Sequence, residues 1–134
     1  MAIQELAATA RAMVAKGKGI LAADESSGTI KKRFDSMNIK STPQNRLNYR
    51  EMLFRTDGIE EFISGVILYD ETIKQKSALD GTPLVKVLND RGIIAGIKVD
   101  KGTNPLVASK AEFVTDGLDG LRERLAEYYE LGAR

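Results

Sequence analysis

The sequence of 134 residues contains neither cysteine nor histidine. Without cysteine there are no disulfides, no thiolate nucleophile and no cysteine-ligated zinc, as a reducing compartment permits, and we take the cytoplasm as the expected location. Without histidine, the commonest proton shuttle and the commonest zinc ligand are both missing. Any chemistry must therefore use carboxylates, lysines, arginines, tyrosines and hydroxyls. A metal-dependent enzyme is the least attractive enzymatic alternative, and we predict no metal site.

The sequence also lacks an excess of charge of one sign and lacks long hydrophobic runs. Its 20 basic and 19 acidic side chains are interspersed and give a formal net charge of +1. This balance does not suggest nucleic acid or a membrane surface as a partner. No segment approaches the roughly 18 apolar residues that a membrane span requires. The expected partner is a small molecule or another protein.

The composition predicts one globular domain over residues 1–134. Hydrophobic residues make up 43% of the chain and charged residues 29%, and no repeat or linker divides it. A secretory signal is not expected near the N-terminus, because Gln4, Glu5 and Arg11 interrupt the apolar positions. Apolar residues recur there at helical spacing and predict an amphipathic helix that belongs to the fold and ends at Gly17: Ile3, Leu6, Ala7, Ala10, Met13 and Val14.

Three short apolar segments predict buried strands, over residues 19–23, 63–69 and 93–99. Helices are predicted over residues 30–36, 43–54, 84–88 and 118–131, and a loop is predicted around Gly102–Pro105. In the 43–54 helix, Tyr49, Met52 and Leu53 form an apolar stripe that Leu47 and Phe54 widen, which leaves its buried face open. The alternation of strands and helices predicts an α/β fold with a parallel sheet.

Residues 19–33 combine a strand, a polar turn and the start of a helix. The strand ends at Ala23, Asp24 follows it, and the helix begins near Thr29. In α/β proteins ligands bind where parallel strands end, and the N–H groups that open a helix suit phosphate. Ser26, Ser27 and Thr29 can equally be helix caps, a role that is compatible with anion binding. This stretch is a candidate corner of an active site.

Asp24 and Lys98 occupy equivalent places at the ends of two strands. Side chains alternate across a strand, so Asp24 shares a face with Ile20 and Ala22, and Lys98 shares a face with Ile94 and Gly96. In a TIM barrel, alternate strands contribute to the same interior layer. The functional interpretation is that Asp24 handles protons or hydroxyls while Lys98 neutralises a phosphate. The simpler interpretation is an ion pair, or solvated charges at frayed strand ends.

Three motifs closely resemble class I fructose-bisphosphate aldolases: GILAADESSGTIKKR, GVILYDET and GIKVDKG. The resemblance extends over essentially the whole chain, including PQNRLNYREMLF and GLDGLRERLAEYYELGAR. It implies that the fold is a TIM (β/α)8 barrel and that the complete protein is an enzyme of glycolysis. It also implies reversible cleavage of fructose 1,6-bisphosphate to dihydroxyacetone phosphate and glyceraldehyde 3-phosphate through a lysine Schiff base. Neither a metal nor another cofactor is implied, and a homo-oligomer, by resemblance a tetramer, is expected of the complete protein.

The resemblance also assigns roles to individual residues. Asp24 matches the catalytic aspartate that contacts the reacting hydroxyl region of the substrate, and Lys98 matches an active-site lysine. Ser26 and Thr29 match hydroxyl positions near the sugar phosphate, with threonine standing where serine is also familiar. Arg33 matches a basic position on the same rim.

The length of the chain departs from the family pattern. A TIM barrel has eight strands and about 250 residues, whereas three strands are predicted here. The resemblance places the Schiff-base lysine, the glutamate acid/base group and another active-site lysine beyond Arg134. We therefore expect the N-terminal part of a barrel, inactive alone and poorly stable or associating because its edges and apolar faces are uncovered. The alternatives are a fragment that keeps a weak sugar-phosphate site and a fragment with a protein-interaction role.

Overall fold

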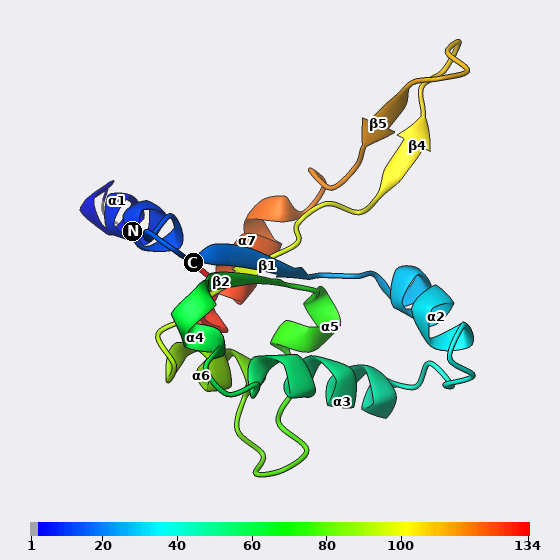
Figure 1. The fold of residues 1–134 in the computed structure, drawn as a ribbon. Coiled ribbons are helices and arrows are strands. Elements are labelled where there is room, and N and C mark those ends of the chain that lie inside the picture. The colour runs from blue at the N-terminus through cyan, green and yellow to red at the C-terminus, as the bar shows by residue number, and fades with distance from the viewer. Residues whose placement is uncertain (1–2) are drawn as a thin grey trace.

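The structure is a computed structural model that describes residues 3–134. Its central feature is a parallel three-stranded sheet in the order β1-β2-β3, formed by β1 (Gly19–Ala23), β2 (Ile63–Leu68) and β3 (Ile94–Ile97) (Figure 1). The predicted strands and their parallel arrangement are thus confirmed, with β2 and β3 slightly shorter than expected. Ala22 pairs with Ile67, which pairs with Gly96, so neighbouring strands are in register toward their carboxyl ends.

Helices connect the strands as crossovers, as the sequence predicted. The first connection holds α2 (Ser27–Asp35), α3 (Pro43–Phe54) and the short α4 (Ile59–Phe62). The second holds α5 (Asp70–Ile73) and α6 (Leu84–Asn89), while α1 (Ile3–Met13) precedes the sheet and α7 (Leu121–Glu130) follows it. Thr42 caps α3 by accepting a hydrogen bond from the Asn45 N–H, with Pro43 in the first turn.

The two faces of the sheet differ in how well they are covered. On one face, Ala23, Val66 and Leu68 join Phe54 of α3 and Leu88 of α6 in the core, and these helices lie on the same side of the sheet (Figure 1). On the other face Ile20 remains 48% exposed. The chain therefore buries one face of its sheet and leaves the other open.

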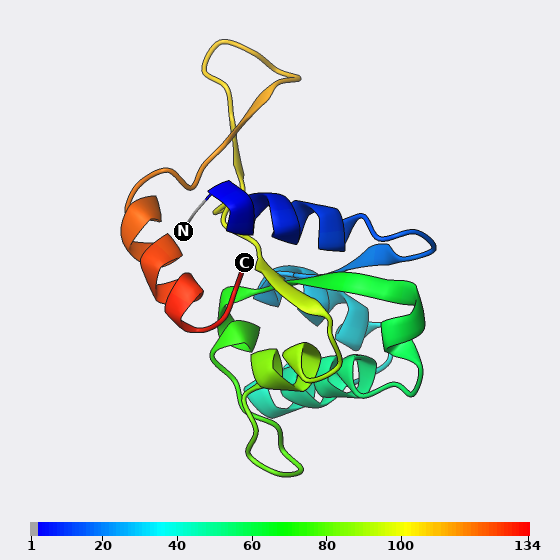
Figure 2. The same ribbon diagram turned by 90° about the vertical axis from the view of Figure 1, so that its left-hand side faces the viewer.

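The predicted N-terminal helix is present as α1, but none of its described side chains is buried and Ile3 is 84% exposed. It lies across the end of the sheet where the strands begin (Figures 1 and 2). Its contact with the sheet is made at its last turn, where the Met13 sulfur lies in the space that a side chain at Gly65 would occupy. The Ser64 hydroxyl also donates a hydrogen bond to the Met13 carbonyl at 2.6 Å. The apolar side of α1 therefore has no apolar surface to pack against among residues 3–134.

The segment predicted as a loop after the third strand is instead a β-hairpin. Strands β4 (Thr103–Pro105) and β5 (Phe113–Thr115) pair antiparallel and project away from the sheet (Figures 1 and 2). Gly102, Asn104 and Pro105 predicted a turn. The strand that pairs with β4 begins ten residues further along the chain and is too short to show an alternating apolar pattern. Gly117 closes the hairpin with a φ of 139°, and a side chain there would meet the Val99 carbonyl.

The structure decides the buried face of α3, which the sequence left open, and confirms Leu47 and Phe54 from the predicted apolar residues. In α3 the buried residues are Leu47, Arg50, Glu51 and Phe54, so two charged side chains lie inside and Met52 is exposed. In α7 Tyr128 alone is buried, and Leu125 and Tyr129 are partly exposed. Arg50 and Glu51 are buried in α3 because residues of other segments supply their ion-pair and hydrogen-bond partners. Within residues 3–134, no helix is both long and apolar enough to cross a membrane.

Candidate functional site

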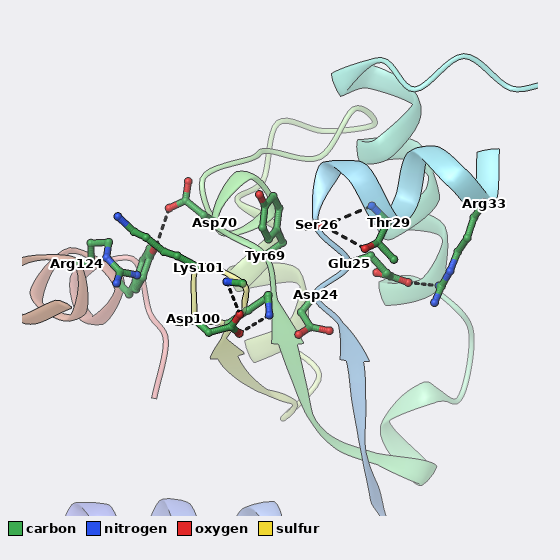
Figure 3. Close-up of a pocket in the computed structure, with 13 residues that line it drawn as sticks. Asp24, Glu25, Ser26, Thr29, Arg33, Tyr69, Asp70, Asp100, Lys101 and Arg124 are labelled. Carbon is green, nitrogen blue, oxygen red and sulfur yellow. Dashed lines mark hydrogen bonds and ion pairs between the residues drawn. The ribbon is translucent and has the colours of Figure 1, made fainter. Parts of the chain in front are cut away.

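All five residues predicted for the site line one cavity of about 840 Å³ where the strands end (Figure 3). Asp24, Ser26, Thr29 and Arg33 come from the turn after β1 and from α2, and Lys98 follows β3. The remaining lining residues are Glu25, Tyr69, Asp70, Asp100, Lys101, Gly102, Arg124 and Tyr128. The cavity therefore lies at the end of a parallel sheet that generally binds ligands.

Strand alternation explains why these side chains meet. In the register of the sheet, Ala22, Ile67 and Gly96 are paired across the three strands. Two residues further along each strand, Asp24, Tyr69 and Lys98 therefore continue the same face. This is the face on which Ile20 is exposed, so the polar row extends the open side of the sheet.

The structure does not pair Asp24 with Lys98. Lys98 instead pairs with Asp100, whose carboxylate also accepts a hydrogen bond from the Gly102 N–H at 3.0 Å. The ammonium of Lys98 and this N–H together hold the pKa of Asp100 below its ordinary value. Asp24 has no hydrogen-bond or ion-pair partner among the side chains drawn in Figure 3. Its carboxylate is therefore free to accept hydrogen bonds from a ligand hydroxyl.

The polar turn after β1 is also the start of α2, two residues earlier than the sequence indicated. Ser26 is the N-cap: its hydroxyl accepts a hydrogen bond from the Thr29 N–H at 3.4 Å and lies 3.1 Å from the Thr29 hydroxyl. Both hydroxyls face the cavity (Figure 3). The capping interpretation is thus confirmed, and the same hydroxyls border the space in which an anion would meet the helix N-terminus.

Arg33 on α2 is held at the rim of the cavity by a carboxylate from the turn. Its Nη1 pairs with Oε1 of Glu25, whose side chain is 9% exposed, whereas that of Arg33 is 58% exposed (Figure 3). Behind Glu25 lies Arg50 of α3, whose side chain is fully buried. Burial lowers the pKa of Arg50, and the charges of Glu25 and Glu71 oppose that effect.

The opposite wall of the cavity is built by α7 and the start of α5. The Tyr128 hydroxyl donates a hydrogen bond to Asp70 at 2.8 Å, and burial together with this carboxylate raises the pKa of Tyr128. Arg124 donates hydrogen bonds to the carbonyls of Val99 at 3.0 Å and Gly117 at 2.6 Å. These bonds fix the base of the hairpin beside Lys101 and Gly102.

Sequence reasoning missed the residues that support the site. Glu25 was part of the predicted turn but received no role, and Tyr69 was taken only as the end of a strand. Arg50 had a detectable signal, because Leu47 and Phe54 are seven residues apart and enclose charged residues at the positions that a buried helical stripe should fill. Tyr128 was given no role in the site, and the structure shows that it is buried in the core and also lines the cavity.

No group of three or more acidic, histidine or cysteine side chains that could hold a metal ion occurs within residues 3–134. The cavity combines carboxylates, hydroxyls, ammonium and guanidinium groups at the ends of parallel strands. Such a set can bind an anionic group at one side and hydroxyls at the other. The fold and the site therefore define an α/β protein with a polar small-molecule site on a parallel sheet.

Comparison with known proteins identifies the family. Residues 5–134 match the family model described as glycolytic fructose-bisphosphate aldolase class-I. The chain is 58% identical over 134 residues to a probable fructose-bisphosphate aldolase class 1 from Xanthomonas campestris pv. campestris. It is also 58% identical over 131 residues to fructose-bisphosphate aldolase 2 of Plasmodium berghei. The chain belongs to the class I fructose-bisphosphate aldolase family.

A solved structure supports the same assignment. Fructose-bisphosphate aldolase from Plasmodium falciparum, in a complex with TRAP and a small-molecule inhibitor, matches 98% of this chain with a TM-score of 0.94 and 53% identity. That protein has the TIM-barrel fold, which agrees with the three parallel strands and flanking helices found here. The chain spans 40% of the length of the Xanthomonas relative, 35% of the Plasmodium berghei relative and 38% of the solved chain.

Proposed function

We propose that this chain supplies one side of the active site of a class I fructose-bisphosphate aldolase. The complete enzyme cleaves fructose 1,6-bisphosphate reversibly to dihydroxyacetone phosphate and glyceraldehyde 3-phosphate. Family membership supports this proposal. The single observation that carries it to individual residues is the convergence of Asp24, Ser26, Thr29, Arg33 and Lys98 on one cavity.

Each of these residues has a role in the proposed reaction. Asp24, with an unengaged carboxylate, accepts a hydrogen bond from a sugar hydroxyl near the bond that is broken. Lys98, paired with Asp100, supplies positive charge on the same face of the sheet. Ser26, Thr29 and Arg33 bind a phosphate group at the rim, where hydroxyls and a guanidinium lie beside the start of α2.

The Schiff base forms on a lysine that lies outside these 134 residues. Its amine adds to the substrate ketone and water leaves, which gives an iminium that withdraws electrons from the carbon–carbon bond to be broken. Lys98 is not that nucleophile, because by family resemblance it matches a different active-site lysine, and its ammonium is paired with Asp100. The isolated 134-residue chain is accordingly inactive.

Borohydride trapping tests the assignment. We define the hybrid enzyme as a polypeptide in which this chain replaces the matching 40% of the Xanthomonas campestris relative. With dihydroxyacetone phosphate and borohydride, the hybrid enzyme should gain one covalent adduct as the iminium is reduced to an amine, and peptide mapping should place it outside residues 1–134. The isolated chain, treated in parallel, should gain none.

Several results would contradict the proposal. An inactive hybrid enzyme that forms no adduct, while the Xanthomonas relative does, would show that this chain cannot serve an aldolase. An adduct on Lys98, or retro-aldol turnover by the isolated chain, would place the nucleophile within these residues. Loss of trapping on treatment with EDTA would revive a metal-dependent mechanism.

A binding function is the second candidate, favoured by the same cavity. The isolated chain would retain a weak sugar-phosphate site built by Ser26, Thr29 and Lys98. Titration with fructose 1,6-bisphosphate should then shift the amide resonances of Ser26 and Thr29. Unchanged spectra at millimolar ligand would remove this candidate.

We further propose that the complete protein is a cytoplasmic homo-oligomer, a tetramer by family resemblance. Exposed apolar side chains on and after the hairpin support association: Val107 is 91% exposed and Leu118 is 83% exposed. Light scattering of the hybrid enzyme across concentration should give a mass of four chains, and a monomer at every concentration would contradict the proposal.

A further inference from the structure

Arg50 is a fully buried arginine that contacts Glu25 and Tyr69, both of which line the cavity. Its Nη2 donates a hydrogen bond to the main-chain carbonyl of Glu25 at 2.7 Å and lies 3.6 Å from Oε2 of the same residue. Its guanidinium carbon lies 6.0 Å from the centre of the Tyr69 ring. Arg50 therefore contacts the segments that follow β1 and β2, at the carboxyl end of both strands.

The burial of Arg50 is unfavourable for stability taken alone. A charge removed from water costs several kcal/mol unless its partners replace the lost hydration. Among residues 3–134, Nε and Nη1 of Arg50 are buried without a hydrogen-bond partner, and so is Oε2 of Glu25. Incompletely satisfied buried charges of this kind are characteristic of sites where geometry serves binding or catalysis.

Glu25 connects Arg50 to the proposed phosphate ligand. Its main-chain carbonyl is held by Arg50, and its carboxylate oxygen Oε1 pairs with Arg33. Asp24 is the residue immediately before Glu25, so the bond to the Glu25 carbonyl also fixes the peptide that follows the proposed catalytic carboxylate. The order from the interior to the rim is Arg50, Glu25 and Arg33, with side-chain exposures of 0%, 9% and 58%.

We propose that Arg50 is a positioning residue that acts through Glu25 to hold the Arg33 guanidinium where it binds the substrate phosphate. The inference rests on the proposed function. Arg50 does not touch substrate, because it is buried behind Glu25 and does not line the cavity. Because Glu25 contacts both arginines, its carboxylate can remain bound to Arg50 when Arg33 turns to a phosphate oxygen. Glu25 therefore stays in place in both states of Arg33.

A double-mutant cycle in the hybrid enzyme tests this coupling. Arg50→Met should raise the KM for fructose 1,6-bisphosphate about tenfold, which corresponds to the loss of roughly one hydrogen bond between a charged group and the phosphate. The change in kcat should stay below about threefold, because phosphate contacts act in ground state and transition state alike. In an Arg33→Ala background, where no guanidinium remains to be positioned, Arg50→Met should change KM by less than about twofold.

Arg46 provides the matched control. It is a second largely buried arginine on α3, one turn before Arg50, and it pairs with Glu71 through two bonds of 2.7 Å. It neither lines the cavity nor contacts Glu25. Arg46→Met should lower the thermal midpoint of the hybrid enzyme and leave KM within about twofold, with and without Arg33.

Two conservative variants cover the case in which Arg50→Met does not fold. Arg50→Lys keeps the charge but cannot span both the carbonyl and the carboxylate of Glu25, so it should recover part of the KM change. Glu25→Gln preserves shape and removes the charge that connects the two arginines. Its effect on KM should again disappear in the Arg33→Ala background.

The outcomes separate this inference from the proposed function. If the unmodified hybrid enzyme is inactive, the proposed function fails and the inference fails with it. If the hybrid enzyme is active and the changes in KM are equal with and without Arg33, Arg50 is a structural residue and the inference alone is wrong. The inference is likewise overturned if Arg46→Met reproduces the dependence on Arg33.

Discussion

Two adjacent residues of α3, Arg50 and Glu51, are both buried and charged, yet their surroundings differ. Arg50 faces the corner after β1, where parts of its guanidinium and of the Glu25 carboxylate lack partners among residues 3–134. Glu51 contacts the 77–82 segment and does not line the cavity, and both of its oxygens are hydrogen-bonded. One helix thus supports an incompletely satisfied charge cluster and a satisfied one.

The cluster around Glu51 resembles a purely structural device. Its carboxylate accepts hydrogen bonds from Arg55 Nε at 2.9 Å, from the Ala78 N–H at 2.9 Å and from the Ser77 hydroxyl. Arg55 continues to Asp80 at 2.8 Å. A buried polar network with every member paired makes a unique local structure more stable. Of these two clusters on α3, the fully paired one therefore lies away from the cavity lining, and the incompletely paired one lies behind it.

The largest difference between an effect on activity and an effect on stability is expected for Asp24→Asn, which changes the cavity. Asp24 has no partner among the side chains around the cavity, so its replacement should leave the urea midpoint of the hybrid enzyme unchanged. Turnover of fructose 1,6-bisphosphate should fall about 10²- to 10⁴-fold, the usual contribution of a positioned acid–base group. Steady-state kinetics and urea unfolding check both parts, with Asp119→Asn as a surface control. Turnover within threefold of the parent would remove Asp24 from the mechanism.

An effect of intermediate size is expected for Glu51→Gln, which should lower stability and leave activity unchanged. The loss of a buried charged acceptor should lower the free energy of unfolding of the hybrid enzyme by about 2 kcal/mol, as for hydrogen bonds to charged groups. KM and kcat should remain within twofold, because Glu51 does not line the cavity. Lys86→Gln, which breaks the exposed pair with Asp90, should change the free energy of unfolding by less than about 0.5 kcal/mol.

A large KM change in Glu51→Gln would erase the distinction between the clusters. The same holds if Lys86→Gln lowers stability as much as Glu51→Gln does, because exposed and buried pairs would then be equivalent. Urea unfolding and steady-state kinetics on the same preparations separate these cases.

The sequence predicted those parts of the molecule that follow a simple period or a local signal. The three strands, a hydroxyl cap at the start of α2 and the convergence of Asp24 with Lys98 depend on apolar runs, capping residues and alternation along a strand. The role of Arg50 depends on a carbonyl 25 residues away, to which no local pattern points. The hairpin was missed because the contacts that hold its base, at Gly117 and Arg124, come from residues distant from β4 in the sequence.

The smallest expected effect is a dependence of stability on pH that arises from the Glu51 carboxylate. Burial opposes ionisation of Glu51, but hydrogen bonds from Ser77, Ala78 and Arg55 outweigh it and hold its pKa below the ordinary value. A carboxyl whose pKa is lower in the folded state stabilises the fold above its unfolded pKa of about 4.3, and this contribution is lost as the pH falls through the folded pKa. The difference in urea midpoint between the hybrid enzyme and Glu51→Gln should therefore shrink as the pH is lowered from 6 to 3.

Other carboxylates with lowered pKa values, such as Asp70 and Glu71, occur in both proteins and cancel in this difference. Asp57→Asn is the matched control, since the Asp57 side chain is fully exposed and should give no difference at any pH. A difference for Glu51→Gln that stays constant down to pH 3 would mean that its hydrogen bonds do not favour the ionised carboxylate. The satisfied cluster would then stabilise α3 by packing alone, and completeness of charge pairing would no longer separate the structural region from the site.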